Sequence, residues 1–82
     1  VSDSEILEAQ ERLLGRTGIF AEPAAAAALA GLAKVQAGPG RFGAEEKVVI
    51  LATGHGLKDV EAPLSRISIP PAIEPRLEAV RV

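Results

Sequence analysis

The five consecutive apolar residues Val48-Val-Ile-Leu-Ala52 are followed directly by Thr53-Gly-His-Gly56, and this stretch decides the predicted fold. An uninterrupted apolar run that includes β-branched residues is typical of a strand covered on both faces, as in a parallel sheet flanked by helices. We therefore predict an α/β fold with one buried parallel strand over 48–52. Because ligands bind beyond the carboxyl ends of strands in open α/β sheets, residues 53–56 are the expected functional site.

A helix is predicted before this run, over residues 3–16. Ser2 and Glu5 have the spacing of a capping box, in which the Ser hydroxyl accepts a hydrogen bond from the N–H of residue 5 and the Glu carboxylate accepts one from the N–H of residue 2. Gly15 and Gly18 tolerate positive φ angles, so the helix is expected to end between them.

A second helix is predicted from Ala24 to Ala37. Pro23 suits its first position, because the N–H that proline lacks would have no partner there. Alanine dominates the segment and favours the helix, and no charged side chain precedes Lys34 in it. A helix without a charged face is expected to be buried on most sides, against a sheet that these 82 residues barely provide. The chain is therefore expected to be mainly helical.

The composition excludes several classes of site and partner. The chain has no Cys and a single His, His55, so it cannot build a disulfide framework, a thiolate metal site or a zinc cluster by itself. Nine basic and eleven acidic residues are mixed along the chain and leave no electrostatic footprint for nucleic acid. No apolar run reaches the roughly 18 residues of a membrane span, so we expect no membrane partner and a reducing, cytoplasmic location. Since the chain opens at Val1 and contains no Met, we expect it to be a piece of a longer polypeptide.

The chain beyond Asp59 is expected to be a Pro-rich, peripheral tail. Four prolines interrupt its short apolar groups, namely Pro63, Pro70, Pro71 and Pro75. One short helix over 74–82 is predicted, with Pro75 in its first turn. The sequence thus divides into residues 1–59, with the helices, strand and ligand loop, and a tail over 60–82.

The loop after the predicted strand holds the candidate binding residues. Thr53 stands where the strand is expected to end, so its hydroxyl either reaches a ligand or only helps to form the turn, and the residues alone leave both open. Gly54 and Gly56 permit close approach of a ligand or form a tight turn, and their spacing matches neither GxGxxG nor a P-loop. His55 between them is more typical of local hydrogen bonding than of acid–base catalysis.

The charged residues near this loop favour structural roles. Lys58 and Asp59 resemble a nucleophilic amine and its partner, but adjacent opposite charges are usually solvated surface features. Glu22 precedes Pro23 at the start of the uncharged alanine segment, where a carboxylate caps the helix or, if buried, is paired or faces a ligand. Capping is the favoured interpretation.

Three blocks of the sequence together carry a family resemblance. They are Val1-Ser-Asp3 with Glu5-Ile-Leu7, then Gly18-Ile-Phe-Ala-Glu-Pro-Ala-Ala-Ala-Ala-Ala-Leu-Ala-Gly31, and Thr53-Gly-His-Gly-Leu-Lys-Asp59. In these residues the chain resembles the carboxyl-terminal part of the threonine synthase family, within the fold-type II (tryptophan-synthase-β-like) pyridoxal-phosphate enzymes. The resemblance runs from Val1 to Asp59, and the tail is only loosely similar.

The resemblance implies a lyase of threonine biosynthesis that uses pyridoxal 5'-phosphate to convert O-phospho-L-homoserine and water to L-threonine and phosphate. It implies that the Thr53 hydroxyl hydrogen-bonds the pyridine nitrogen of the cofactor, and it implies a homodimer for the intact enzyme. The family's Schiff-base lysine and phosphate-binding glycine loop belong to an upstream segment, so Lys58 is not that lysine. Many relatives have Ser where this chain has Ala25.

Taken alone, the chain is therefore expected to be inactive, to contain no catalytic or metal-binding residue, and to have the remainder of its own polypeptide as its partner. Two alternatives stay open at this point. One is another fold-type II lyase, such as a threonine dehydratase. The other is a self-standing, non-catalytic helical interaction module.

Overall fold

The computed structural model describes residues 1–80. Its first element is helix α1, which spans Asp3–Thr17. Its capping box is present: Glu5 N–H donates to Ser2 Oγ (3.2 Å), and Ser2 N–H donates to the Glu5 carboxylate (2.6 Å). Gly18 follows the helix with a φ of 76°, and its N–H donates to the carbonyl of Leu14. Both predicted ends are confirmed, because capping depends on residues a few positions apart.

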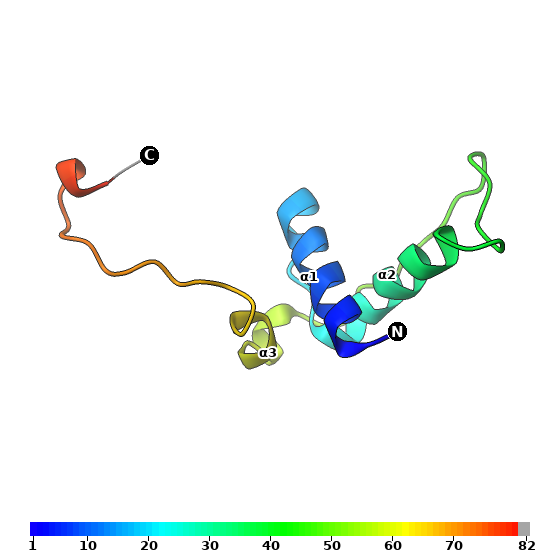
Figure 1. Ribbon diagram of the computed structural model, residues 1–82, viewed down its shortest axis with the longest axis horizontal. Helices are drawn as coiled ribbons and strands as arrows, with labels where there is room; N and C mark the ends of the chain where they lie inside the picture. The colour runs from blue at the N-terminus through cyan, green and yellow to red at the C-terminus, as the bar shows by residue number, and fades with distance from the viewer. Residues whose placement is uncertain (81–82) are drawn as a thin grey trace.

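Helix α2 spans Pro23–Gln36, one residue earlier than predicted at each end, with the proline in its first turn. It packs against α1, and the two helices cross near the start of α2 (Figure 1). The buried apolar residues of the two helices are all alanines: Ala9, Ala25, Ala26 and Ala30. Small side chains bring the two backbones close together, so the core is narrow and lies between α1 and the first half of α2.

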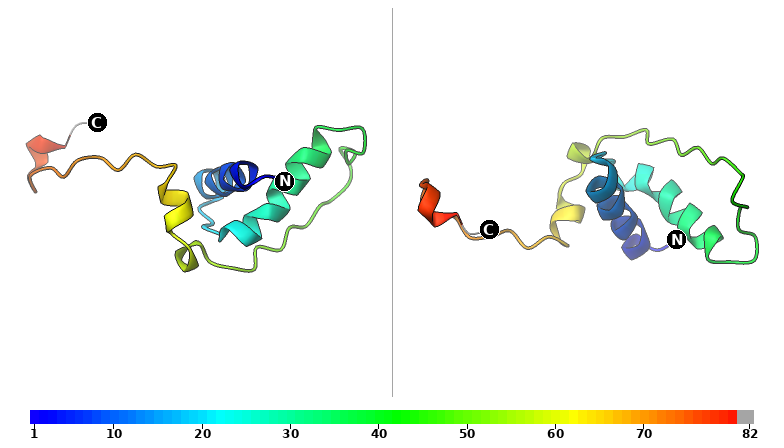
Figure 2. Two further views of the ribbon diagram at one scale, coloured as in Figure 1. Left: turned by 60° about the horizontal axis from the view of Figure 1, so that its bottom comes forward. Right: turned by 90° about the horizontal axis from the view of Figure 1, so that it is seen from above.

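The predicted buried parallel strand over 48–52 is wrong for this structure. Residues 47–52 are irregular, and Val49 and Leu51 are 83% and 74% exposed. A strand is held by hydrogen bonds to neighbouring strands, and the described residues contain no second strand that would supply them. The segment instead returns alongside α2 toward the connection between α1 and α2 (Figure 2).

The chain after this segment packs on α1 through α3 and Arg66 and then leaves the helical body. A 3-10 turn, η1 (Gly56–Lys58), leads into the short helix α3 (Glu61–Leu64), which packs on α1 with Pro63 buried. Arg66 Nε then donates to Glu11 Oε1 of α1 at 3.1 Å. Beyond this ion pair the chain extends away from the helices (Figure 1), which makes the molecule 52 Å long and only 20–25 Å across.

The predicted helix over 74–82 is reduced to a single 3-10 turn, η2, over Leu77–Ala79. Leu77 of this turn is 83% exposed, so it buries little apolar surface. Positions 81 and 82 of that prediction lie outside the described residues. A short helix gains its stability from packing of its apolar face, so it is incomplete here.

Candidate functional site

Residues 20–22 and 54–56 lie side by side as a short antiparallel pair, which we call the clasp. Ala21 faces His55 in an isolated β-bridge. Two backbone hydrogen bonds flank this bridge: Glu22 N–H donates to the Gly54 carbonyl (2.9 Å), and Gly56 N–H donates to the Phe20 carbonyl (2.8 Å). The clasp thus joins the start of α2 to the residues that directly follow Thr53.

Close packing, not backbone conformation, explains the two glycines of the clasp. Neither has a positive φ. A Cβ on Gly54 would collide with the carboxyl group of Glu22, and a Cβ on Gly56 would collide with the ring of Phe20. The groups that approach the two glycines are thus side chains of this chain, and not the ligand that one of the two interpretations of the sequence expected.

Thr53 immediately precedes the clasp and is exposed. Thr53 was predicted to stand at the end of a strand, and it does not. The hydrogen bond from Glu22 N–H to the Gly54 carbonyl anchors the Gly54–His55 peptide, one residue beyond Thr53. The hydroxyl of Thr53 is therefore presented next to an anchored stretch of backbone.

His55 makes the local hydrogen bond that the sequence favoured. Its Nδ1 accepts from Leu57 N–H (3.1 Å), and this bond caps η1. The imidazole also lies edge-on to the ring of Phe20, with ring centroids 5.9 Å apart and planes at 77°. Edge-to-face contacts of this kind favour a fixed ring orientation, so both features of His55 serve the shape of the loop.

The capping interpretation of Glu22 is wrong, since its side chain makes no hydrogen bond to the first turn of α2. Its carboxylate forms an ion pair with Lys58, with Nζ and Oε2 3.5 Å apart. The Glu22 side chain is 21% exposed and that of Lys58 is 67% exposed. The predicted surface role of Lys58 holds, but its partner is Glu22 across the clasp and not the adjacent Asp59.

Gln10 belongs to this site and was missed by the sequence analysis. Its side chain is 1% exposed, and Nε2 donates to the carbonyl of Ala21 at 2.7 Å. Its Oε1 is buried without a hydrogen-bond partner in the described part of the chain. A signal was available, because residue 10 is three or four positions from Ile6, Leu7, Leu13 and Leu14 and therefore lies in the apolar stripe of α1.

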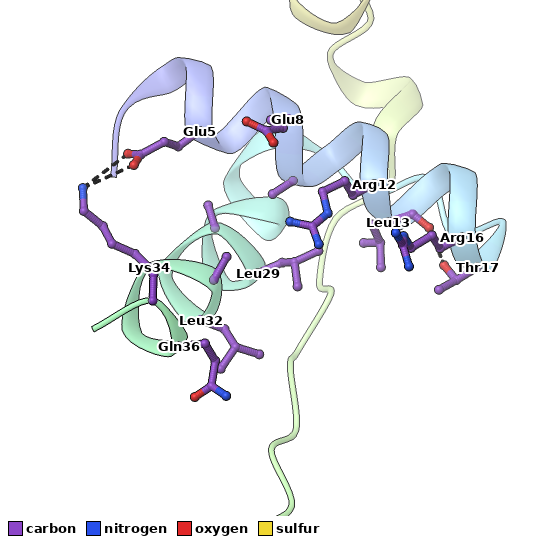
Figure 3. A pocket seen from close by; sticks show the side chains of 14 residues that line it. Glu5, Glu8, Arg12, Leu13, Arg16, Thr17, Leu29, Leu32, Lys34 and Gln36 are labelled. Atoms are coloured by element: carbon purple, nitrogen blue, oxygen red, sulfur yellow. Dashed lines mark hydrogen bonds and ion pairs between the residues drawn. The ribbon is translucent and has the colours of Figure 1, made fainter. Parts of the chain in front are cut away.

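A groove of about 730 Å³ runs between α1 and α2, away from the clasp (Figure 3). Leu13 and Leu29 line it, and an ion pair between Lys34 Nζ and Glu5 Oε1 (3.4 Å) links the last turn of α2 to the first turn of α1. Neither Thr53 nor any residue of the clasp lines this groove. The sequence-predicted site and this groove are therefore different places on the molecule.

A smaller hollow of about 460 Å³ adjoins the clasp from the other side. Gln10 and Phe20 line it together with Pro63 of α3. Among residues 1–80, no group of three His, Asp or Glu side chains is placed to hold a metal ion. In the same residues, no helix combines the length and the apolar character needed to cross a membrane.

Comparison with known proteins identifies the family. A profile of the family described as pyridoxal-phosphate dependent enzyme matches residues 1–54, which include Thr53 and all of α1 and α2. The chain is also similar to proteins named threonine synthase. The protein from Methanocaldococcus jannaschii is 45% identical over 74 residues, which are 90% of this chain and 18% of that protein.

Two further relatives carry the same name. The threonine synthase of Halalkalibacterium halodurans is 44% identical over 78 residues, 95% of this chain and 22% of that protein. That of Methanosarcina acetivorans is 41% identical over 81 residues, 99% of this chain and 20% of that protein. The chain thus spans about a fifth of the length of these relatives. Because the family profile covers more than half of its residues, the chain belongs to the pyridoxal-phosphate dependent enzymes, as its sequence motifs predicted.

Proposed function

We propose that this chain is part of a threonine synthase, which converts O-phospho-L-homoserine and water to L-threonine and phosphate. The observation that carries the proposal is the identity of 41–45% with three proteins of that name, each over at least 90% of this chain. The similarity includes the segment after residue 54, where the general family profile no longer matches. Membership of an enzyme family also speaks against a self-standing interaction module.

Within this enzyme, Thr53 is proposed to donate a hydrogen bond to the pyridine nitrogen of pyridoxal phosphate. When bound, the cofactor supplies a ring that withdraws electrons from the reacting carbon. Thr53 fits such a contact because it is exposed and the next residue, Gly54, is anchored through its carbonyl. A threonine hydroxyl is far too weak an acid to protonate a pyridine nitrogen, so it donates a hydrogen bond and leaves the ring neutral.

Lys58 is not proposed as the lysine that binds the cofactor covalently. Its ammonium group is paired with Glu22 and largely exposed, whereas a lysine that acts as a nucleophile is typically desolvated or placed beside another cation. We propose that the covalent lysine and the phosphate-binding loop belong to the remainder of the polypeptide, and that this chain alone is inactive.

The remainder of the polypeptide is also the proposed partner of the exposed apolar surfaces. Val49 and Leu51 face solvent, and half of the side chains that line the groove between α1 and α2 are alanines and leucines. Residues 1–59 would then form part of the large domain, with 48–52 joining its parallel sheet, and residues 60–82 a peripheral tail. From the family resemblance we further propose that the whole enzyme is a homodimer and that it is cytoplasmic. Light scattering on the whole protein tests the homodimer.

The test uses the whole enzyme of which this chain is a part. Incubation with O-phospho-L-homoserine is expected to release phosphate and L-threonine in equal amounts, and Thr53→Val is expected to lower turnover while leaving the fold intact. Thr53→Ser, which keeps a hydroxyl, is the matched control and should retain most of the activity. Formation of 2-oxobutanoate from L-threonine without phosphate release would instead assign a dehydratase. Unchanged turnover and cofactor absorbance in Thr53→Val would remove the role assigned to Thr53.

A further inference from the structure

The carbonyl of Ala21 is held from α1 by a single buried side chain. Ala21 and Gln10 are each 1% exposed, and Gln10 Nε2 donates to the Ala21 carbonyl at 2.7 Å. Water has little access to this carbonyl, so without Gln10 the acceptor would be buried and unpaired. The bond spans 11 residues and crosses from a helix to the middle of the clasp.

Ala21 is also the residue through which the clasp acts on the loop. It faces His55, and the next N–H along the chain, that of Glu22, donates to the Gly54 carbonyl. Gly54 is bonded covalently to Thr53. A continuous series of contacts therefore leads from α1 through Gln10 and Ala21 to Gly54, the residue that directly follows Thr53.

We propose that Gln10 is a positioning residue for Thr53, an inference that rests on the proposed function of the whole enzyme. Gln10 does not reach the cofactor or the substrate in this role. It fixes the segment over 20–22, which in turn fixes the backbone on the carboxyl side of Thr53, so the hydroxyl is presented at one place. A functional group has to be held by a second layer of hydrogen bonds because small displacements cost large factors in rate.

Gln10→Met in the whole enzyme tests this role. Methionine is similar in length and apolar, so it removes the donor and also the unpaired Oε1, and the fold is expected to survive. Gln10→Leu serves as the second variant if Gln10→Met does not accumulate. The matched control is Gln36→Met, because Gln36 accepts a backbone hydrogen bond of equal length (2.7 Å, from Phe42 N–H) far from the clasp.

Three readouts are compared. Hydrogen exchange of the Glu22 and Gly56 amides is expected to become about tenfold faster in Gln10→Met and to stay unchanged in Gln36→Met. The absorption and fluorescence of bound cofactor should shift in the same direction in Gln10→Met as in Thr53→Val, which is measured alongside. The kcat should fall about tenfold, with a smaller change in KM, since only the placement of an existing group has changed.

Unchanged exchange of the two clasp amides in Gln10→Met would overturn the inference. So would faster exchange with wild-type cofactor absorption and kcat, which would make Gln10 merely structural. If the wild-type enzyme does not act on O-phospho-L-homoserine, the proposed function fails. The amide exchange and the cofactor spectrum then still decide the role of Gln10, since neither depends on that substrate.

Discussion

The carboxyl group of Glu22 fills the space into which a side chain at Gly54 would project, while Glu22 N–H donates to the Gly54 carbonyl at 2.9 Å. The ring of Phe20 has the same relation to Gly56. The two contacts differ in how easily they give way. A glutamate side chain can swing into solvent, whereas the Phe20 ring also packs against His55.

Substitution of the clasp glycines should reflect this difference. Gly56→Ala is expected to lower the free energy of unfolding by about 1–3 kcal/mol, because the aromatic ring must move to admit a methyl group. Gly54→Ala is expected to cost less, since the Glu22 side chain can turn away. Thermal unfolding followed by circular dichroism measures both. Gly40→Ala is the control, as a Cβ there meets nothing within 4 Å, and a loss as large as that of Gly56→Ala would contradict the steric explanation.

Two glycines at the end of α1 should respond to alanine with opposite signs. Gly18 has a φ of 76°, which costs an L-residue with a side chain about 1–2 kcal/mol. Gly18→Ala should therefore destabilise the chain. Gly15 lies inside α1 with open space around it, so Gly15→Ala should stabilise by about 0.5–1 kcal/mol through helix propensity. Denaturant unfolding of both variants checks this, and equal signs would rule out the left-handed cap.

The capping box predicts a pH dependence of stability. The backbone N–H of Ser2, followed by the ammonium of Lys34, holds the pKa of Glu5 below its ordinary value of 4.5. A carboxyl group with a lowered pKa in the folded state stabilises the protein above its unfolded pKa. This contribution is lost as the pH falls through the lower, folded value.

Glu5→Gln removes this carboxylate, so wild type should be the more stable protein at about pH 6, and the difference should shrink as the pH falls below 4.5. Thermal midpoints measured across this range report it. Glu8→Gln removes a carboxylate from the same helix outside the capping box and serves as the control. A difference between wild type and Glu5→Gln that does not change with pH would contradict the assignment.

Substitution of Lys58 is expected to have little effect on stability or cofactor binding. Its ion pair with Glu22 is 3.5 Å long and its side chain is 67% exposed. Such a pair contributes about 1 kcal/mol or less. Lys58→Ala in the whole enzyme is therefore expected to keep the covalently bound cofactor and most of the turnover. Loss of the cofactor's absorption band after borohydride reduction and denaturation would show instead that Lys58 binds the cofactor.

The sequence predicted the two helices well because their signals are local. Ser2, Glu5 and Gly18 fix α1 through contacts within four residues, and Pro23 fixes the start of α2 in the same way. The strand over 48–52 could not be judged by the same means. Its apolar pattern indicates that the segment should be buried. The hydrogen bonds that hold a strand come from a neighbouring strand, and residues 1–80 contain no strand that could supply them.

The candidate site was predicted in part. The sequence predicted residues 53–56 as the functional site, and the structure pairs Gly54, His55 and Gly56 with residues 20–22. It did not foresee the pairing itself, because segments more than 30 residues apart carry no mutual signal in a single sequence. Gln10 was missed because glutamine on a helix is usually solvated, and only its place in the apolar stripe marks it as buried.

The clasp has a consequence for the apolar run that precedes it. Pairing of 20–22 with 54–56 closes the intervening chain into a loop, so residues 48–52 are tethered at both ends while α2 occupies much of the loop as a rigid rod. Much of the chain entropy that a free segment would lose on finding a neighbouring strand has then been lost already. If residues 48–52 pair with a strand from outside the described residues, this pairing should therefore be faster than that of the same peptide free in solution.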